Sequence, residues 1–472
     1  MTNRPQNVIL LTIDCLRADH ISSMGYKRPT TPCIDALRQE SINFSQAYAV
    51  GPYTPASFPA ILTSTYPLMH GGYGGKLAPQ RVPLAEVLSQ AGWHTAAVHS
   101  NPFLSRHYGY ERGFDLFIDG DFSKKSEQFQ QRSRWRQRLE GMGWLYRFCR
   151  SLFLFYEREV VARQNFRNAY WPASRITAAG LDVLEQSPGD LFLWLHFMDV
   201  HQPYHPPQEC LAHIGGQALK ERDMLHLWKK MNEAPDELTQ KEIEALVDLY
   251  DASICYADQQ LARFFAHLKE RGLYDDALII VTADHGEEFY EHGGLQHREA
   301  KLYDELVRVP LVVKLPQGEY GGVLVKDPVS LLDLAPTVLD LANLAESTFK
   351  GESLKATWEE NEAAERTVIS QCFNGPLNKG DLSGDGTRLL ACRVQNWKLI
   401  YHENTGCCEL YDLAQDPLEK QDLAATRTDQ VDRLKSEIKA HISLLDSTEV
   451  SVSEEPGGEE ILQRRLQSLG YL

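Results

Sequence analysis

The chain has 472 residues, of which 43% are hydrophobic, 10% aromatic and 24% charged. These values are typical of a folded globular protein and exclude a disordered or fibrous chain. Acidic residues outnumber basic ones by 65 to 48, so the formal charge is −17. Because nucleic-acid affinity depends on clustered Lys and Arg, this balance argues against a nucleic-acid-binding protein. The length suffices for roughly two to four domains, or for one large core with an appendage.

The sequence does not indicate membrane insertion or export. No apolar run approaches the roughly 18 to 20 residues of a membrane-spanning helix. The first such run, residues 8–13, is too short for the core of a signal peptide. The nine cysteines are odd in number and irregularly spaced, which is not typical of a disulfide framework. We therefore expect a reduced, cytoplasmic protein without a transmembrane segment.

Continuous apolar runs rich in β-branched residues predict buried strands of the kind found in parallel sheets. These runs are residues 8–13, 191–195, 277–281 and 309–313. Amphipathic helices are predicted between them. They lie at residues 83–91, 176–185 and 243–271. Strands that alternate with helices predict an α/β fold, a doubly wound sheet with helices on both faces.

The C-terminal part has a different pattern. Two short strands are predicted at residues 388–394 and 397–402, followed by a helix at residues 428–445. This pattern is typical of a small antiparallel β subdomain with a packing helix. We therefore expect a catalytic α/β domain over residues 1–350, followed by an α+β subdomain and tail over residues 351–472.

A basic and aromatic insertion is expected at about residues 122–175. Within it, residues 124–167 contain eleven Lys and Arg against four Glu, interleaved with Trp, Tyr, Phe and Leu. A helix of this composition can lie on an anionic membrane surface or bind an anionic substrate. It can equally be a cap that packs its aromatic side chains on the core and exposes its arginines. The sequence leaves both interpretations open.

Side chains of metal-ligand type follow the predicted strands directly. Asp14 follows the first strand, and Asp284 and His285 follow the strand at residues 277–281. Ligands of open α/β sheets bind outside the carboxyl ends of the strands, so these side chains are expected to converge. Mixed oxygen and nitrogen donors favour Zn²⁺ or Mn²⁺, whereas Ca²⁺ and Mg²⁺ prefer oxygen alone. The sequence therefore predicts a site for one or two divalent ions.

A candidate nucleophile and metal ligand, Thr54, lies in residues 51–64. Thr54 suits the N-cap of a helix and Pro55 suits the first helical position, and an apolar run follows. A hydroxyl there faces free backbone N–H groups and the positive end of the helix dipole, which bind anions and favour an alkoxide. A metal ion on the hydroxyl would favour the alkoxide further. The alternative is a capped helix without a catalytic role.

Further histidine and aspartate side chains crowd near these segments. They are His196, Asp199, His201, His205, His292 and His297. We expect His201 and His297 to be catalytic and substrate-binding, because each could hold substrate oxygens or a second ion, and one could protonate the leaving group. Asn101, after a predicted strand at residues 95–99, is a further candidate for substrate binding. For His196, Asp199, His205 and His292, the alternative is an ordinary structural residue of the core or the surface.

Several ordered motifs resemble the sulfatases of the alkaline phosphatase superfamily. Asp14 follows the first strand, and the segment that contains Thr54 ends in Leu62-Thr-Ser-Thr-Tyr-Pro67. The blocks Asp199-Val-His-Gln-Pro-Tyr204 and Asp284-His-Gly-Glu287 are also similar. The resemblance continues in residues 302–311, 333–339, 396–400, 409–417 and 466–471. It covers most of the chain apart from residues 122–175 and about 205–240. It implies an alkaline-phosphatase-like fold, with a doubly wound mixed sheet and helices on both faces, and a metal-dependent ester hydrolase.

The sequence departs from the sulfatase pattern at the nucleophile. Sulfatases carry Cys or Ser there, followed by Pro and Arg in a pattern that directs oxidation to formylglycine. This chain has Thr54, Ala56 and Phe58 at those positions, so no formylglycine can form. Cys15 stands where an aspartate usually follows the first metal ligand. The threonine is similar to the nucleophiles of nucleotide pyrophosphatases, phosphodiesterases and lipid phosphoethanolamine and glycerophosphate transferases of the same superfamily.

Together these features predict a metal-dependent hydrolase that cleaves a phosphodiester or phosphonate monoester through Thr54. The substrate is expected to be an anionic small molecule or a lipid ester. Two alternatives stay open: a sulfuric ester hydrolase that acts without formylglycine, and a non-catalytic binder of an anionic lipid or glycan. A peripheral membrane contact through residues 124–167 and a homo-oligomer are both compatible with the sequence.

Overall fold

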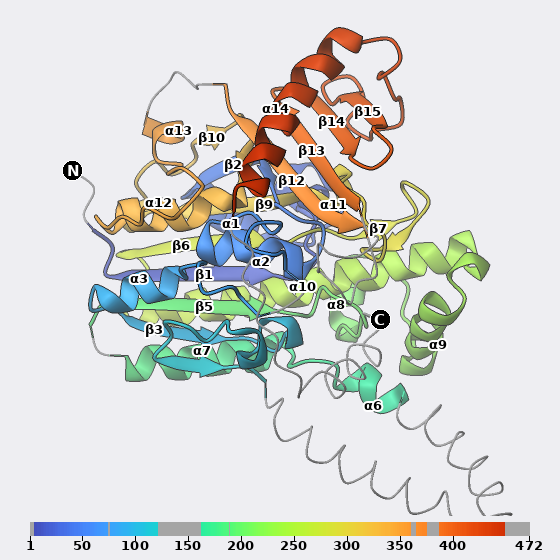
Figure 1. Cartoon of the computed structure of the whole chain (residues 1–472). Helices are drawn as coiled ribbons and strands as arrows, with labels where there is room; N and C mark the ends of the chain where they lie inside the picture. Colours follow the sequence, from blue (N-terminus) through green and yellow to red (C-terminus); the bar gives the residue numbers. More distant parts are fainter. Residues whose placement is uncertain are drawn as a thin grey trace, which may run out of the picture.

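A nine-stranded sheet with the order β10-β2-β9-β6-β1-β5-β3-β4 forms the centre of the molecule, and β11 also pairs with β2 (Figure 1). The computed structural model describes residues 4–73, 76–120, 162–187, 189–359, 365–374 and 387–448. The strands of this sheet are β1 (Asn7–Ile13), β2 (Ile42–Tyr48), β3 (His94–Val98), β4 (Leu116–Ile118), β5 (Leu191–Phe197), β6 (Ala277–Ala283), β9 (Arg308–Lys314), β10 (Leu324–Val325) and β11 (Val329–Ser330).

The central strands are the buried apolar runs that the sequence predicts. Every residue of β1, β5 and β6 is buried, and β1 pairs in parallel with both neighbours. The run at residues 309–313, expected as a further parallel strand, instead forms β9, which is antiparallel to β2 and β6. A strand covered on both faces is apolar whichever way it runs, so its composition does not reveal its direction. The sheet is therefore mixed, as the resemblance to the alkaline phosphatase superfamily implies.

Two groups of helices cover the sheet, as expected for a doubly wound fold (Figure 1). The first group packs around α10 and consists of α1 (Pro32–Gln39), α7 (Ala173–Gln186), α8 (Gln208–His213) and α10 (Gln240–Glu270). The second packs around α2 and consists of α2 (Thr54–Thr63), α3 (Leu84–Gln90) and α12 (Leu334–Leu341). The three predicted helices correspond to α3, α7 and α10, within three residues at each end. A capping box of Thr239 and Glu242 fixes the start of α10.

A second, four-stranded antiparallel sheet forms the C-terminal part, also as expected. Its strands are β12 (Thr367–Asn374), β13 (Thr387–Val394), β14 (Trp397–His402) and β15 (Cys408–Asp412). Helix α14 (Thr428–Asp446) packs on β13 and β14 and buries Leu434 and Ile438 against Leu390 and Leu399. The remaining elements are α6 (Ala162–Arg167), α9 (Glu221–Glu233), α11 (Asp304–Val307), α13 (Ala356–Glu359) and the hairpin of β7 (Glu288–Phe289) and β8 (Leu295–Gln296).

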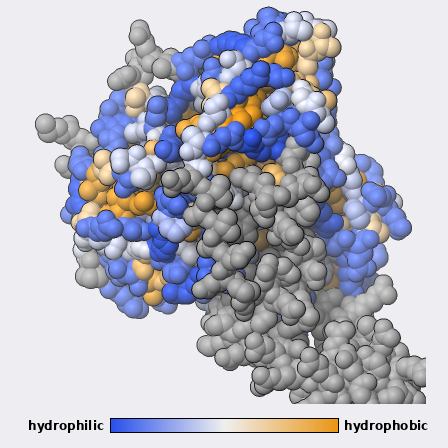
Figure 2. Space-filling view, in the orientation of Figure 1, coloured by the Kyte–Doolittle hydropathy of each residue, from blue (hydrophilic) through white to orange (hydrophobic). Residues whose placement is uncertain are grey.

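Most of the basic insertion lies outside the described residues, so the structure does not distinguish a cap from a membrane contact. Of residues 122–175, the structure describes 162–175, where α6 and the start of α7 lie. Outside the grey residues, the face seen in Figure 2 is largely hydrophilic, with scattered apolar patches. In the described ranges, no helix combines the length and the apolar character that a membrane span requires.

The register of the central strands brings distant segments to one edge of the sheet. Ile13 at the end of β1 pairs with Phe197 of β5 and with Ala283 of β6. The three strands therefore end level with one another. Because they are parallel, the residues that follow them, among them Asp14 and Asp284, emerge side by side above an apolar core.

Candidate active site

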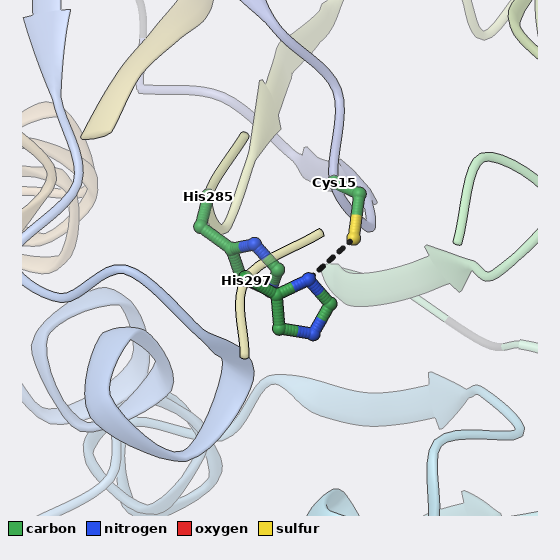
Figure 3. Close-up of side chains that lie close together, drawn as sticks. All are labelled: Cys15, His285 and His297. Atoms are coloured by element: carbon green, nitrogen blue, oxygen red, sulfur yellow. Dashed lines mark hydrogen bonds between the residues drawn. The ribbon is translucent and has the colours of Figure 1, made fainter. Parts of the chain in front are cut away.

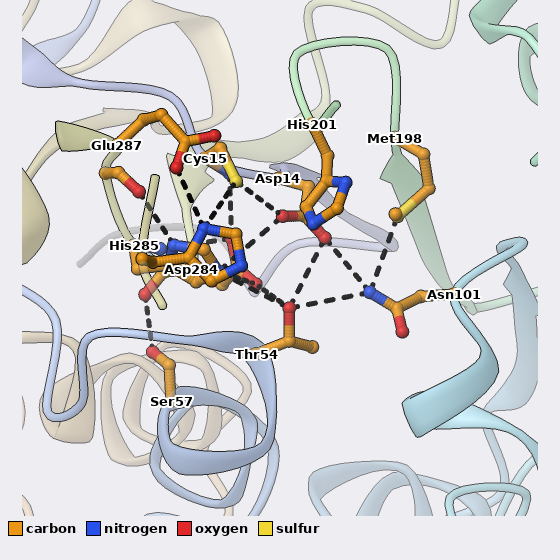
Figure 4. Close-up of polar contacts among 12 residues, drawn as sticks. Asp14, Cys15, Thr54, Ser57, Asn101, Met198, His201, Asp284, His285 and Glu287 are labelled. Atoms are coloured by element: carbon orange, nitrogen blue, oxygen red, sulfur yellow. Dashed lines mark hydrogen bonds and ion pairs between the residues drawn. The ribbon is translucent and has the colours of Figure 1, made fainter. Parts of the chain in front are cut away.

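Five polar side chains from four segments meet at this edge of the sheet (Figure 4). Asp14 follows β1, Asp284 and His285 follow β6, Asn101 is the third residue after β3, and Thr54 begins α2. All five side chains are buried, with exposed fractions of 1% or less. The structure thus brings together the four predicted metal ligands and one predicted substrate-binding residue.

The four candidate ligand side chains have the spacing of donors that share one ion. Thr54 Oγ1 lies 3.0 Å from Asp284 Oδ2, 3.4 Å from Asp14 Oδ2 and 3.4 Å from His285 Nε2. His285 Nε2 lies 3.5 Å from Asp284 Oδ2 and 3.6 Å from Asp14 Oδ1. Ligands at about 2.0 to 2.2 Å from a tetrahedral ion are separated by about 3.3 to 3.6 Å. Four of the five separations lie in this range, and the shorter one, 3.0 Å, is the hydrogen bond from the Thr54 hydroxyl to Asp284.

A hydrogen bond orients His285 as a candidate metal ligand. Its Nδ1 lies 2.8 Å from the carbonyl oxygen of Gly286, so the Nδ1–H donates to that carbonyl. The lone pair of Nε2 then faces the two carboxylates. Asp14, Asp284 and His285 form one of the groups of side chains close enough to hold a metal ion.

Within the described residues, no Lys or Arg side chain balances the negative charges of Asp14 and Asp284. There, the ion-pair partners of Asp14 and Asp284 are the histidines His196 and His285. Burial opposes ionisation of Asp14, but the His196 hydrogen bond and the charges of nearby histidines outweigh it and lower its pKa. Burial, and next the charge of Asp14, raises the pKa of Asp284. A divalent cation would relieve this repulsion between the carboxylates.

The start of α2 differs from the expectation at Thr54. The helix begins at Thr54 and its N-cap is Tyr53, so the Thr54 hydroxyl does not cap the helix. Pro55 has no N–H and the Ala56 N–H donates to the carbonyl of Tyr53, which leaves fewer free amides than expected. The hydroxyl instead points at the buried carboxylates, which are the stronger acceptors.

Asn101 connects Thr54 to the Asp14 carboxylate. Its Nδ2 donates to Asp14 Oδ2 at 3.0 Å and lies 3.5 Å from Thr54 Oγ1 and 3.4 Å from Met198 Sδ. Its Oδ1 accepts the backbone N–H of Phe103 at 3.0 Å, which fixes the amide orientation. Asn101 can therefore donate to an oxygen that approaches Thr54.

His201 and His297 lie beside this cluster, with ring centroids 5.2 Å apart. His201 Nδ1 lies 2.6 Å from the carbonyl of Gln202, and burial lowers the pKa of His201 to about 4. His297 lies 4.6 Å from the ring of His285 and its Nδ1 is 2.9 Å from Glu287 Oε1. Burial lowers the pKa of His297, but the charge and hydrogen bond of Glu287 outweigh it and raise the pKa overall.

Cys15 lies beside His297, with its sulfur directed at the imidazole ring (Figure 3). Its Sγ donates to Asp14 Oδ1 at 3.1 Å and lies 3.8 Å from His297 Nδ1. Its backbone N–H donates to Asp284 Oδ1 at 3.3 Å from a left-handed conformation with φ of +60°. Burial, followed by the charges of Glu287 and the two aspartates, raises the pKa of the thiol, so it acts as a neutral donor.

His196 supports the cluster from within β5. Its Nε2 lies 3.2 Å from Asp14 Oδ2 and its Nδ1 lies 2.9 Å from Thr12 Oγ1. The ring is fully buried and packs edge-on against Phe58. His196 therefore orients Asp14, and its place in the strand keeps it beneath the cluster.

Three of the candidates lie outside the cluster, which corrects the expectation for them. The Asp199 carboxylate accepts the backbone N–H of Ala173 at the start of α7. His205 packs its ring on Phe166 at 5.1 Å. His292 stacks on Tyr303 at 3.7 Å, bonds Glu305 and reaches the carbonyl of Glu419. Closeness in sequence did not place them in the cluster, because the loops turn these side chains toward neighbouring elements.

Glu287 was missed by the sequence reasoning, although it stands two residues after His285. Glu287 is fully buried and its carboxylate accepts from His297 and from the Tyr204 hydroxyl. Ser57 was also missed: its Oγ donates to the carbonyl of Asp284 at 2.6 Å and holds that loop against α2. The available signal was the second carboxylate of the motif Asp284-His-Gly-Glu287.

Comparison with known proteins agrees with this architecture. A sulfatase family model matches residues 6–344, and a model of the C-terminal part of N-sulphoglucosamine sulphohydrolase matches residues 290–447. An arylsulfatase of Clostridium perfringens is 24% identical over 451 residues, covering 88% of this chain and 90% of the relative.

Solved structures show the same fold. A protein in complex with its substrate D-glucosamine-2-N,6-O-disulfate has a TM-score of 0.71 at 17% identity, covering 96% of this chain and 100% of the other. The phosphonate monoester hydrolase of Agrobacterium radiobacter has a TM-score of 0.69 at 21% identity, with the same coverage. Since the sulfatase model spans well over half of the sequence, the chain belongs to the sulfatase family of the alkaline phosphatase superfamily.

Proposed function

We propose that the protein is a metal-dependent hydrolase that cleaves a phosphodiester or a phosphonate monoester through Thr54. The observation that carries this proposal is the position of the Thr54 hydroxyl. It is buried and lies 3.0 to 3.4 Å from donor atoms of Asp14, Asp284 and His285. A hydroxyl that only caps a helix would instead bond the backbone of its own first turn.

The donor set fits a divalent ion, which Asp14, Thr54, Asp284 and His285 would hold. When bound, the ion supplies Lewis-acid stabilisation of the negative charge that develops during the reaction. Asp284 Oδ2, 3.0 Å from Thr54 Oγ1, is placed to accept the hydroxyl proton. Mixed oxygen and nitrogen donors support Zn²⁺ or Mn²⁺ over Ca²⁺ and Mg²⁺.

Thr54 acts as the nucleophile in two in-line steps. Its Oγ1 forms a bond to phosphorus while the bond between phosphorus and the leaving-group oxygen breaks, which gives phosphothreonine. Water then attacks the same phosphorus, the bond to Thr54 Oγ1 breaks, and Asp284 returns its proton to Oγ1. Asn101 donates to an oxygen of the transferred group, and His201 lies on the side where the other oxygens are held.

The charges in the site support a substrate with one negative charge. Within the described residues, the charged partners of Asp14, Asp284 and Glu287 side chains are histidines, and no Lys or Arg side chain pairs with them. One divalent ion balances Asp14 and Asp284, which leaves little positive charge for a dianion. Phosphodiesters and phosphonate monoesters are monoanions at neutral pH, whereas phosphate monoesters are largely dianionic.

A sulfate ester is also a monoanion, and the name of the Clostridium perfringens relative favours this second candidate. Against it, Thr54 cannot form the aldehyde hydrate of a formylglycine. The name of the Agrobacterium radiobacter structure supports a phosphonate monoester instead. A non-catalytic binder would need no such set of metal donors around a hydroxyl.

The deciding experiment compares a phosphodiester, a phosphonate monoester, a phosphate monoester and a sulfate ester with one aryl leaving group and saturating metal. We expect the first two to be fastest, and Thr54→Ala to lower their kcat/KM by at least about 10³-fold. Mass spectrometry of acid-quenched reactions should find the phosphoryl group on Thr54.

The matched control is Thr63→Ala, which removes a buried threonine from the same helix. Thr63 Oγ1 donates to the carbonyl of Pro59 and does not contact the site. It should keep activity within a few-fold of wild type. Retention of more than a tenth of the activity by Thr54→Ala on every ester would rule out the covalent route. A faster sulfate ester would establish the second candidate instead.

A further inference from the structure

Glu287 is a buried carboxylate that is held at several points beside the metal donors, yet it does not reach them (Figure 4). Its Oε2 accepts the Tyr204 hydroxyl at 2.9 Å, and its carbonyl accepts Arg17 Nη1 at 2.9 Å. Its N–H donates to the carbonyl of Glu305 at 3.0 Å. These bonds leave Oε1 directed at His297 Nδ1, 2.9 Å away. Such a fixed carboxylate can orient an imidazole ring.

His297 is oriented by this contact. With the Nδ1–H donated to Glu287, Nε2 lies on the other side of the ring, which Figure 3 shows turned away from Cys15. The preceding residue, Gln296, has a left-handed φ of +64° and is buried, so the chain turns sharply to present His297. The ring then lies between those of His201 and His285.

His201 is held differently. Its Nδ1 contacts the neutral carbonyl of Gln202 at 2.6 Å, whereas His297 contacts a full carboxylate. A carboxylate accepts a stronger hydrogen bond than a neutral carbonyl does, so it fixes the orientation of the imidazole ring more firmly. The two histidines are therefore held differently, and Glu287 determines which nitrogen of His297 is left for other partners.

We propose that Glu287 is a positioning residue that acts through His297 on the leaving group. It holds the ring with Nδ1–H on its carboxylate, so that Nε2–H donates to the leaving-group oxygen, and Tyr204 holds Glu287 in turn. As the bond from phosphorus to that oxygen breaks, the Nε2 proton moves to the oxygen. When water hydrolyses the phosphothreonine, it returns a proton to Nε2. Glu287 stays ionised throughout. This inference rests on the proposed function.

The test compares two phosphodiesters that differ in the leaving group, an alkyl alcohol and 4-nitrophenol. The alkoxide needs protonation and the nitrophenolate does not. Glu287→Gln should lower kcat for the alkyl ester by about 10 to 100-fold and for the nitrophenyl ester by less than about 3-fold, with little change in KM. A merely structural defect would lower both rates equally.

The matched control is Glu305→Gln, because Glu305 is a second buried carboxylate that bonds a histidine, His292, outside the cluster. It should leave the ratio of the two rates unchanged. Tyr204→Phe should change the ratio in the same direction as Glu287→Gln, but less. In a His297→Gln background, Glu287→Gln should have no further effect on the alkyl ester, because the two residues act as one unit.

Proton NMR gives a readout that does not depend on turnover. The Nδ1–H of His297, bonded to a buried carboxylate, should give a resolved downfield resonance that Glu287→Gln removes and Glu305→Gln keeps. Equal loss on both esters, or a resonance unchanged by Glu287→Gln, overturns this inference. Absence of turnover by the wild type on both esters overturns the proposed function instead, so the two failures are distinguishable.

Discussion

Two buried clusters of acidic residues balance their charge in opposite ways. The first comprises Asp14 and Asp284 with Thr54 and His285, and we call it the metal cluster. The second, the lysine cluster, comprises Asp304, Lys398 and Glu419, where Lys398 Nζ lies 2.7 Å from a carboxylate oxygen of each acid. Lys398 and Glu419 are almost fully buried, with exposed fractions of 2%. The lysine cluster thus contains its own cation.

The metal cluster contains no such cation within the described residues. Its carboxylates meet histidines, a hydroxyl, an amide and a thiol. Taking two carboxylates out of water costs several kcal/mol per charge unless an opposite charge is present. In the lysine cluster, the positive charge of Lys398 offsets this cost. Its contact with Asp304 also connects the C-terminal sheet to α11. In the proposed function, a divalent cation from solution would offset this cost in the metal cluster.

The largest expected effect comes from breaking the metal cluster. Asp14→Asn should remove the bound ion and lower activity by at least about 10³-fold, because one charge and one ligand are lost. A chelator should lower the unfolding temperature of the wild type and leave that of Asp14→Asn unchanged, since bound ion stabilises the folded state. Elemental analysis measures the metal content.

Asp304→Asn is the control from the lysine cluster. It should keep both the ion and the response to chelator, although it weakens the contact with Lys398. Equal metal loss in the two variants would show that the clusters are not independent, and the contrast between them would then fail.

A smaller effect on activity and a large one on stability are expected from Lys398→Met. Removal of the lysine leaves Glu419 buried without its cation, which should lower the free energy of unfolding by about 3 to 5 kcal/mol. Metal content and activity per folded molecule should stay at wild-type values. Urea unfolding measures the stability and elemental analysis measures the metal content. Loss of the ion from Lys398→Met would contradict the distinction between the two clusters.

The smallest effect concerns Asp199, a buried acid outside both clusters. Burial raises its pKa to about 7 from 3.8, and the Ala173 N–H only partly opposes this. Because the folded state keeps the proton longer than the unfolded state, stability should fall as pH rises from about 4 to 7, by a few kcal/mol. The stability that protonated Asp199 contributes should be fully present below about pH 4.

Asp199→Asn should flatten this dependence, since the amide does not ionise and keeps an acceptor for Ala173. The measurement is the difference in urea stability between wild type and variant at pH 5 and pH 8. A difference that does not change with pH would show that Asp199 is ionised in the folded protein across this range.

Sequence reasoning worked where a local pattern has one structural meaning. Residues 8–13 and 277–281 form strands because long β-branched runs bury well on both faces, and Asp14 and Asp284 follow from the rule on strand ends. It failed where direction depends on neighbours. The apolar pattern of residues 309–313 does not reveal that β9 runs antiparallel, so the mixed sheet was expected from the family resemblance alone. Asp199 and His292 point away from the cluster.

By itself the sequence determined the chemistry that the protein can offer: a threonine in place of an oxidisable cysteine or serine, two aspartates and several histidines after strands, and no formylglycine. These follow from residue identity. Only the tertiary structure decided which groups act together. The Thr54 hydroxyl leaves its helix for the carboxylates, and Glu287 pairs with His297 ten residues away. The physical reason is that burial makes each polar group seek its strongest available partner, and packing of distant segments decides which partner is within reach.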